Sequence, residues 1–294
     1  MNCFLMYWND GTIHTIDDIS QEQCNLFRDS YDRVEKLIAI HSLFSYVRLA
    51  WNNMQNLKNT LLPFSHENRP LSEKHFIQAE KGSRDFLYHY MTYCDSLGAF
   101  FKKEFGRKDK TTTSIEKSLN SLEKVPEVSF VHSLRNYATH EGGVLSFVYR
   151  ERETIKFLVD TKSLIKRRSN WEKSDLKLMK SYGDVFDIII PFEYAYNELR
   201  NFHCLMIVQY INTNGLGKAI YLLQTFKQEL DHYIVNKGDE VFFSDAQDEN
   251  GRSVTREEFS QGKGKGFVSE WIRWDTLEEL AHFLEIFPAC EDHK

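Results

Sequence analysis

The sequence predicts a mainly α-helical protein, and three observations support this fold class. Only five prolines occur in 294 residues, so few positions prevent a helix from continuing. Hydrophobic residues make up 41% of the chain and aromatic residues 14%, which is enough to bury a sizeable core. Apolar residues also recur at helical spacing over long stretches, as from Val34 through Ile38 and Val47 to Met54.

The first third of the chain predicts a hairpin followed by two long helices. Residues 4–8 and 12–15 flank the turn sequence Asn9-Asp10-Gly11, a combination typical of a short hairpin. Helical spacing then extends over residues 20–61. A second helix is expected over residues 72–105, with Ser72 as its cap and Gly106 after its end.

Shorter elements are expected in the middle of the chain. A loop rich in Lys, Thr and Ser leads to residue 114, and helices follow over 114–122 and 128–140, the second with Pro126 near its start. Gly142-Gly143 supplies the stop for that second helix. Residues 144–150 and 154–160 alternate apolar and polar side chains, which predicts an inserted hairpin.

The remaining residues predict helices followed by a mixed segment. Helical patterns cover residues 173–181, 184–210 and 216–233, and Pro191 either kinks the second helix or lies in its first turn. The last sixty residues combine extended pieces at 241–244 and 266–274 with a helix at 276–286. We therefore expect residues 1–235 to form a helical bundle with N-terminal and inserted hairpins. Residues 236–294 would form a small α+β C-terminal extension.

Composition also narrows the class of function. The five cysteines are scattered without a CxxC pair, which is typical of reduced thiols in a cytoplasmic protein. The N-terminus lacks a secretory pattern, and the apolar runs are too short to span a bilayer, so no membrane partner is expected. The net charge of −6 argues against nonspecific coating of nucleic acid, so a nucleic-acid site would have to be local. Solvated loop charge is the simpler interpretation of the basic clusters, which are Lys102-Lys103 with Arg107, Lys108 and Lys110; Lys166-Arg167-Arg168; and Lys263 with Lys265.

The predicted helix over residues 128–140 has two chemically different faces. At about 100° per residue, one face carries only apolar side chains and the other carries groups that move protons and bind phosphate. The apolar face consists of Phe130, Val131, Leu134, Tyr137 and Ala138, and the polar face of His132, Arg135, Asn136, Thr139 and His140. We refer to the second set as the polar face.

Other patterns carry weaker signals. Arg84 and His89 repeat the spacing of Arg135 and His140, but they lie in mid-helix with ordinary charges beside them, which indicates a solvated helix face. An amphipathic helix with its polar side in water also remains an alternative for Arg135 and His140. No group of histidines and carboxylates has metal-ligand spacing, so neither a metal nor a cofactor is expected. The segment 214–218 is too short for a phosphate loop.

Arg135, Asn136 and His140 near the end of a core helix, with two long helices before them, resemble the HEPN superfamily. The resemblance covers residues 15–143 and extends through the helices up to residue 233. Many members of that superfamily are ribonucleases that need no metal. One subgroup has a tyrosine two residues after the histidine, where this chain has Gly142, so modification of such a tyrosine is not implied.

The resemblance implies a role for each residue of the polar face. His140 would act as general acid or base, Arg135 would stabilise the phosphorane, and Asn136 would support them. His132 and Thr139 are expected RNA contacts, although a structural role for His132 is the alternative. The resemblance further implies a homodimer with facing motifs, and a toxin or phage-defence role with an antitoxin or regulatory protein as partner.

Two non-catalytic alternatives stay open. The chain could be a HEPN-like module that binds a nucleotide or a protein without cleaving RNA, and the acidic net charge favours this class. It could also be a structural interaction module, with Arg135 tied to a carboxylate inside a single chain. Loss of cleavage on replacing His140 would distinguish the nuclease from both.

Overall fold

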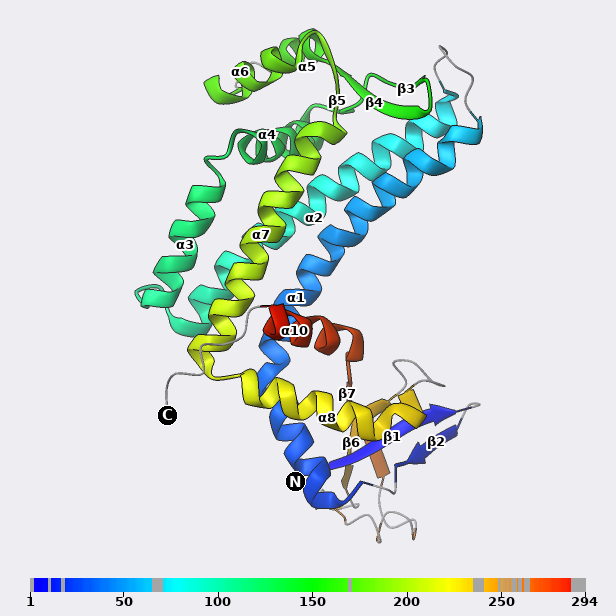
Figure 1. The fold of residues 1–294 in the computed structure, drawn as a ribbon, viewed down its shortest axis with the longest axis vertical. Helices are drawn as coiled ribbons and strands as arrows, with labels where there is room; N and C mark the ends of the chain where they lie inside the picture. Colours follow the sequence, from blue (N-terminus) through cyan, green and yellow to red (C-terminus); the bar gives the residue numbers. More distant parts are fainter. Residues whose placement is uncertain are drawn as a thin grey trace. The chain divides into compact units, whose positions relative to one another are not determined.

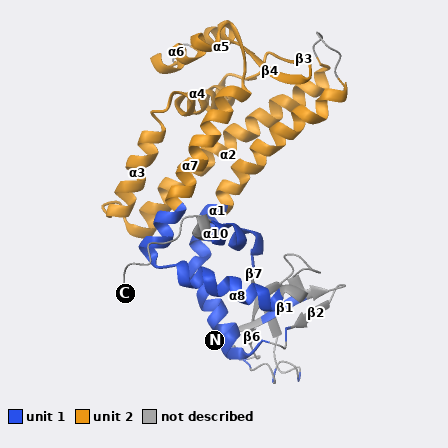
Figure 2. Cartoon of the chain, in the orientation of Figure 1, with its two compact units in different colours: residues 1–41, 207–294 blue, residues 42–206 orange. Residues whose placement is uncertain are grey.

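The computed structural model describes residues 3–9, 12–16, 19–64, 71–168, 171–234, 241–247 and 265–286, and single positions at 250, 252, 254, 258 and 261. The fold is mainly α-helical with short antiparallel strands, as the sequence predicts (Figure 1). The chain divides into two compact units (Figure 2). Unit 1 comprises residues 1–41 and 207–294, and unit 2 comprises residues 42–206.

Long helices form the body of unit 2. They are the second part of α1 (Gln21–Leu61), the whole of α2 (Glu73–Phe105) and the first part of α7 (Ile189–Asn214). The short 3₁₀ helix η1 (Leu62–Phe64) follows α1. Phe86 of α2 lies in the core of this body, with its ring centroid 5.8 Å from Trp51 of α1 and 4.7 Å from Phe192 of α7. Aromatic packing of this kind holds the three helices together.

Two shorter helices follow α2 in the chain. These are α3 (Lys110–Leu122) and α4 (Pro126–His140). The prediction of a loop up to residue 114 is wrong, because the Asp109 carboxylate accepts a hydrogen bond of 2.7 Å from the Thr111 amide and starts α3 at residue 110. Pro126 occupies the first helical position of α4, where its missing N–H costs nothing.

Capping also differs from prediction at α2. Ser72 stands at the N-cap position, as predicted, but its side chain makes no capping hydrogen bond. Its hydroxyl instead lies 3.1 Å from Nδ1 of His75. Gly106 follows the last residue of α2 with a φ of 86°, in the left-handed region that glycine adopts without strain.

A three-stranded antiparallel sheet with two helices completes unit 2. Its strands lie in the order β3 (Phe147–Glu151), β4 (Thr154–Asp160) and β5 (Val185–Asp187). Helices α5 (Thr161–Arg167) and α6 (Lys173–Tyr182) lie between β4 and β5 in the sequence. The β3–β4 hairpin is confirmed, whereas α5 and β5 were not predicted. The prediction that residues 184–188 are helical is wrong, because β5 pairs with residues 158–160 of β4. Pro191 lies in the first turn of α7, which is one of its two predicted positions.

Unit 1 is built from segments near both ends of the sequence. Its sheet has the strand order β2 (Thr12–Thr15), β1 (Cys3–Asn9), β6 (Val241–Gln247) and β7 (Lys265–Trp271), all antiparallel. Helices α8 (Gly217–Ile234) and α10 (Trp274–Ile286) contact each other. The N-terminal hairpin is confirmed, but it shares a sheet with strands that were predicted to lie in a separate extension. The predicted boundary between residues 235 and 236 lies outside the described residues and stays a prediction.

Asp187 at the end of β5 is a largely buried carboxylate. Its Oδ1 accepts hydrogen bonds from the amides of Phe157 (3.2 Å) and Ile189 (3.1 Å), and its Oδ2 lies 3.6 Å from the Lys58 ammonium. Burial raises the pKa of Asp187 and outweighs Lys58 and the two amides, which lower it. The folded state therefore binds this proton more tightly than the unfolded state does. The contribution of Asp187 to stability accordingly falls as pH rises from its unfolded to its folded pKa.

We predict opposite effects for two substitutions at this position. Asp187→Asn keeps an acceptor for both amides and removes the buried charge, so at pH 7 it should be at least as stable as the wild type. Asp187→Ala leaves two amides without an acceptor and should lose about 1 to 3 kcal/mol. Urea unfolding at pH 7 measures both. Equal losses in the two variants would show that the ionised form is the favoured one.

Candidate functional site

Helix α4 has the two faces that the sequence predicts. Its inner residues are buried, and they are Val128, Phe130, Val131, Leu134, Tyr137 and Ala138. The helix packs against α2 and α6. The Phe130 ring stacks on Trp171 at 6.1 Å and the Tyr137 ring on the same indole at 5.9 Å. This burial fixes the rotation of α4 about its axis and turns the polar face outward.

The polar face presents Arg135 together with exposed side chains. Asn136, Thr139 and His140 are exposed, and Arg135 is half-buried. Nη1 of Arg135 donates to Oδ1 of Asn136 at 3.2 Å, and the Thr139 hydroxyl donates to the backbone carbonyl of Arg135 at 2.9 Å. Within the described part of the chain, no carboxylate forms an ion pair with Arg135. Its guanidinium therefore stays available to an external anion.

His132 belongs to the packing of α4 more than to the exposed surface. Its ring meets the edge of Tyr90 on α2, with centroids 6.1 Å apart, and its Nε2 is buried without a hydrogen-bond partner among the described residues. Burial lowers the pKa of His132, and the neighbouring Arg135 lowers it further, against Glu123 and Asp95. The lowered pKa favours the neutral imidazole, which suits packing better than a cationic contact to phosphate.

The helix ends directly after His140. The Glu141 amide donates to the carbonyl of Tyr137 at 2.8 Å, and Gly142 follows with a φ of 127°, which side chains with a Cβ rarely adopt. The predicted stop at Gly142-Gly143 is thus confirmed. His140 is the last helical residue and projects from the end of α4.

A carboxylate from another helix holds the segment that follows. Glu80 of α2 accepts hydrogen bonds from the Val144 amide at 2.9 and 3.0 Å and from the Leu145 amide at 2.8 Å. The Arg84 guanidinium lies 2.8 Å from the same carboxylate. Residues 144 and 145 therefore form this anchored connection rather than the start of the predicted strand. The role of Glu80 was not predicted, since its partners lie 64 and 65 positions further along the chain.

The second Arg-x4-His match is occupied by contacts of its own. Arg84 pairs with Glu80, and His89 stacks on Tyr46 of α1 with ring centroids 5.7 Å apart. Arg84 and His89 thus make contacts within α2 and between α2 and α1. They also provide an internal comparison for Arg135 and His140, which have the same spacing.

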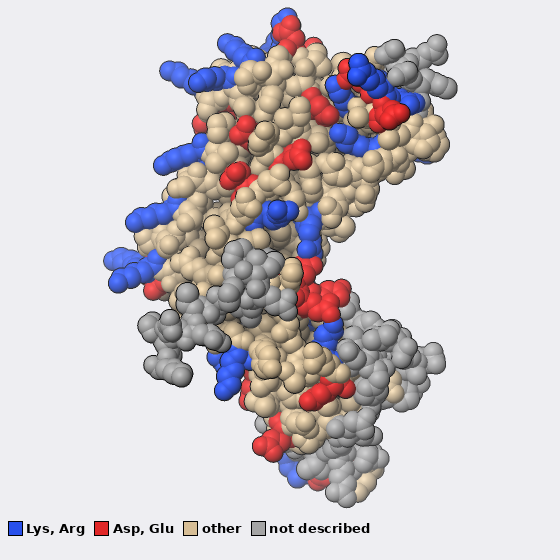
Figure 3. Space-filling view, viewed as in Figure 1, with Lys and Arg blue, Asp and Glu red and all other residues tan. Residues whose placement is uncertain are grey.

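Charge is distributed unevenly along the chain. Residues 42–206 contain 25 Lys and Arg and 20 Asp and Glu, a formal charge of +5, whereas the residues of unit 1 contain 12 and 23, a formal charge of −11. Figure 3 shows Lys and Arg side chains along the margin of unit 2 that carries α3, α5 and α6. Exposed basic residues of these helices are Lys110, Lys117, Lys162, Lys166, Arg167, Lys173, Lys177 and Lys180. The unit that contains the polar face is therefore the basic one.

Neither grouped metal-ligand side chains nor membrane-spanning helices are found among the residues that the structure describes. No three of their His, Cys, Asp and Glu side chains are grouped to hold a metal ion. None of their helices has the length and apolar character to cross a bilayer. Comparison with protein-family models, curated proteins and solved structures finds no match to this chain.

The Glu80 anchor leads to a prediction about stability. Glu80→Ala should destabilise the protein by about 3 kcal/mol, because it leaves the amides of Val144 and Leu145 without their charged acceptor. Asp85→Ala, at an exposed acidic position of the same helix, should change stability by about 0.5 kcal/mol or less. Urea unfolding of both variants at pH 7 tests this. Similar small losses would mean that the anchor is not needed.

Proposed function

We propose that this protein is a metal-independent RNA endonuclease that works through the polar face of α4. The observation that carries the proposal is an arginine without a carboxylate partner in the described structure, on the same helix as an exposed histidine that is the last helical residue. An imidazole can transfer the protons, and a guanidinium can stabilise the negative charge, in cleavage of an RNA phosphodiester. The net positive charge of unit 2 supports binding of a polyanion.

The chemistry uses a nucleophile that RNA itself supplies. The 2′-hydroxyl loses its proton and attacks the adjacent phosphorus, and the bond from phosphorus to the 5′-oxygen breaks as that oxygen receives a proton. The products are a 2′,3′-cyclic phosphate and a 5′-hydroxyl. His140 transfers one of these protons, and Arg135 stabilises the charge that develops on the phosphorane oxygens. Asn136, bonded to Arg135, orients the guanidinium.

A homodimer follows from the number of proton transfers. The reaction removes one proton and donates another, whereas the polar face of one chain offers a single exposed histidine at its helix end. Two chains with facing α4 helices would supply one His140 as base and the other as acid. Such an enzyme would act on cytoplasmic RNA. Because it would damage the cell's own RNA, a toxin or phage-defence role with an antitoxin or regulatory partner fits this chemistry.

A non-catalytic binding module is the second candidate. A pocket beside α4 is lined by Tyr137, on the buried face of α4, and not by Arg135 or His140. A ligand could therefore bind beside this helix without meeting the polar face. In that case Arg135 and His140 would contribute surface charge and polarity only.

Replacement of the two motif residues tests the nuclease directly. His140→Ala and Arg135→Ala should each reduce cleavage of a mixed RNA pool in EDTA by about 100-fold or more, because each removes one essential group. His89→Ala is the matched control, since His89 has the same spacing from an arginine. It should leave cleavage unchanged. Circular dichroism of each variant verifies the fold.

The ends of the products provide a second readout. Cyclic phosphate ends that disappear in His140→Ala are the expected result. Cleavage that persists in both motif variants would exclude this site, as would complete inhibition by EDTA. A folded wild-type protein that leaves every RNA intact would support the binding module instead.

A further inference from the structure

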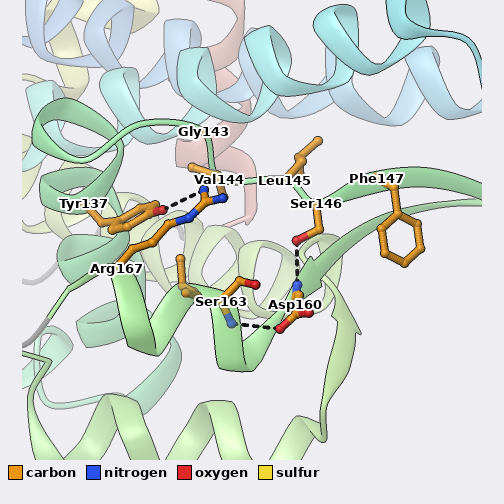
Figure 4. A pocket seen from close by; sticks show the side chains of 10 residues that line it. Tyr137, Gly143, Val144, Leu145, Ser146, Phe147, Asp160, Ser163 and Arg167 are labelled. Carbon is orange, nitrogen blue, oxygen red and sulfur yellow. Dashed lines mark hydrogen bonds between the residues drawn. The ribbon is translucent and has the colours of Figure 1, made fainter.

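A pocket of about 300 Å³ lies between α4, the residues after it and α5. This volume is at the lower end of the range of about 300 to 1,000 Å³ that holds small organic ligands. Figure 4 shows its lining side chains in a row from one end to the other. Arg167 and Tyr137 lie at one end and Phe147 at the other, with Ser146, Ser163 and Asp160 between them.

The first end of the pocket suits a phosphate group. Nη1 of Arg167 donates to the Tyr137 hydroxyl at 3.5 Å, and that hydroxyl keeps its own proton for a ligand. Arg167 forms no ion pair with a carboxylate within the described ranges. Guanidinium groups bind phosphate oxygens in two parallel hydrogen bonds. A single anionic group can therefore be held here by Arg167 and Tyr137.

The middle of the pocket suits hydroxyl groups. Oδ1 of Asp160 accepts from the Ser163 amide at 2.8 Å, and no described residue bonds to its Oδ2. The Ser146 hydroxyl accepts from the Asp160 amide at 2.8 Å and can still donate its own proton. A carboxylate and two serine hydroxyls that line the same pocket can supply donors and acceptors for the hydroxyl groups of a sugar.

The residue at the far end of the pocket is aromatic. Phe147, the first residue of β3, is 36% exposed although it is a large apolar side chain. A nucleobase can stack on such a ring whatever its sequence. The order of guanidinium, sugar-binding oxygens and aromatic ring thus corresponds to the order of phosphate, ribose and base.

We propose that this pocket binds a nucleoside monophosphate unit, with the phosphate at Arg167, the ribose hydroxyls at Asp160 and the base on Phe147. This site is separate from the polar face of α4, and it does not depend on RNA cleavage. The unit is either a free mononucleotide or one residue of an RNA chain. Tyr137 lies between Arg135 and His140 in the sequence, so the ligand would contact the helix that carries both.

Isothermal titration calorimetry on the full chain tests the proposal with adenosine 5′-monophosphate, inorganic phosphate and a single-stranded oligoribonucleotide. Arg167→Ala should weaken binding of the mononucleotide by about tenfold or more, because it removes the charged donor. Phe147→Ala should weaken binding of the mononucleotide by a similar factor and leave the affinity for inorganic phosphate unchanged. Lys166→Ala is the matched control, since it removes an exposed positive charge of the same helix outside the pocket lining.

The ligands distinguish the source of the nucleotide. Binding of the monophosphate alone supports a free nucleotide, whereas binding of the oligoribonucleotide with the same dependence on Arg167 and Phe147 supports an RNA residue. If neither adenosine 5′-monophosphate nor the oligoribonucleotide binds at millimolar concentration, the proposal is overturned. Equal weakening by Lys166→Ala and Arg167→Ala would also overturn it, because general electrostatic attraction would then explain the affinity.

Discussion

The hydrogen bonds between the Glu80 carboxylate and the amides of Val144 and Leu145 are the constraint on which both candidate sites depend. The anchored residues follow the end of α4, and they also line the pocket beside it. One carboxylate on α2 therefore fixes the chain after His140 and one wall of the pocket. Charge-assisted bonds to backbone amides are stronger than neutral ones, so a single side chain can hold an irregular segment in place.

Local sequence patterns were sufficient to predict most of the helices and the two hairpins. The buried residues of α4 are those of the predicted apolar face, because 3.6-residue periodicity relates directly to burial. Elements that depend on distant partners were missed. Strand β5 has only three residues and exists because β4 pairs with it, and no local pattern of Val185 to Asp187 carries that information. The sheet that joins β1 to β6 was missed for the same reason.

The candidate site shows the same division between local and distant information. Spacing placed Arg135, Asn136, Thr139 and His140 on one polar face of the helix. In the structure Asn136, Thr139 and His140 are exposed, and Arg135 is half-buried. Spacing also grouped His132 with them, but Tyr90 on α2 covers part of its ring. Neither Glu80 nor the pocket residue Arg167 could be linked to α4, because their contacts join segments far apart in sequence. The basic character of unit 2 could not be seen in the composition, because the net charge of −6 is the sum of +5 for unit 2 and −11 for unit 1.

The pairing of β1 with β6 has a consequence for synthesis of the protein on the ribosome. Strand β1 emerges early, whereas β6 becomes available only after all of unit 2 has been translated. A two-stranded hairpin alone is marginally stable, so β1 and β2 must wait with an unpaired edge for their sheet. The strands of the unit 2 sheet, in contrast, all lie within residues 147–187, so none of them has to wait for a segment near the C-terminal end of the sequence. Domains generally fold as units during translation, and the basic unit with its polar helix face would therefore be complete first.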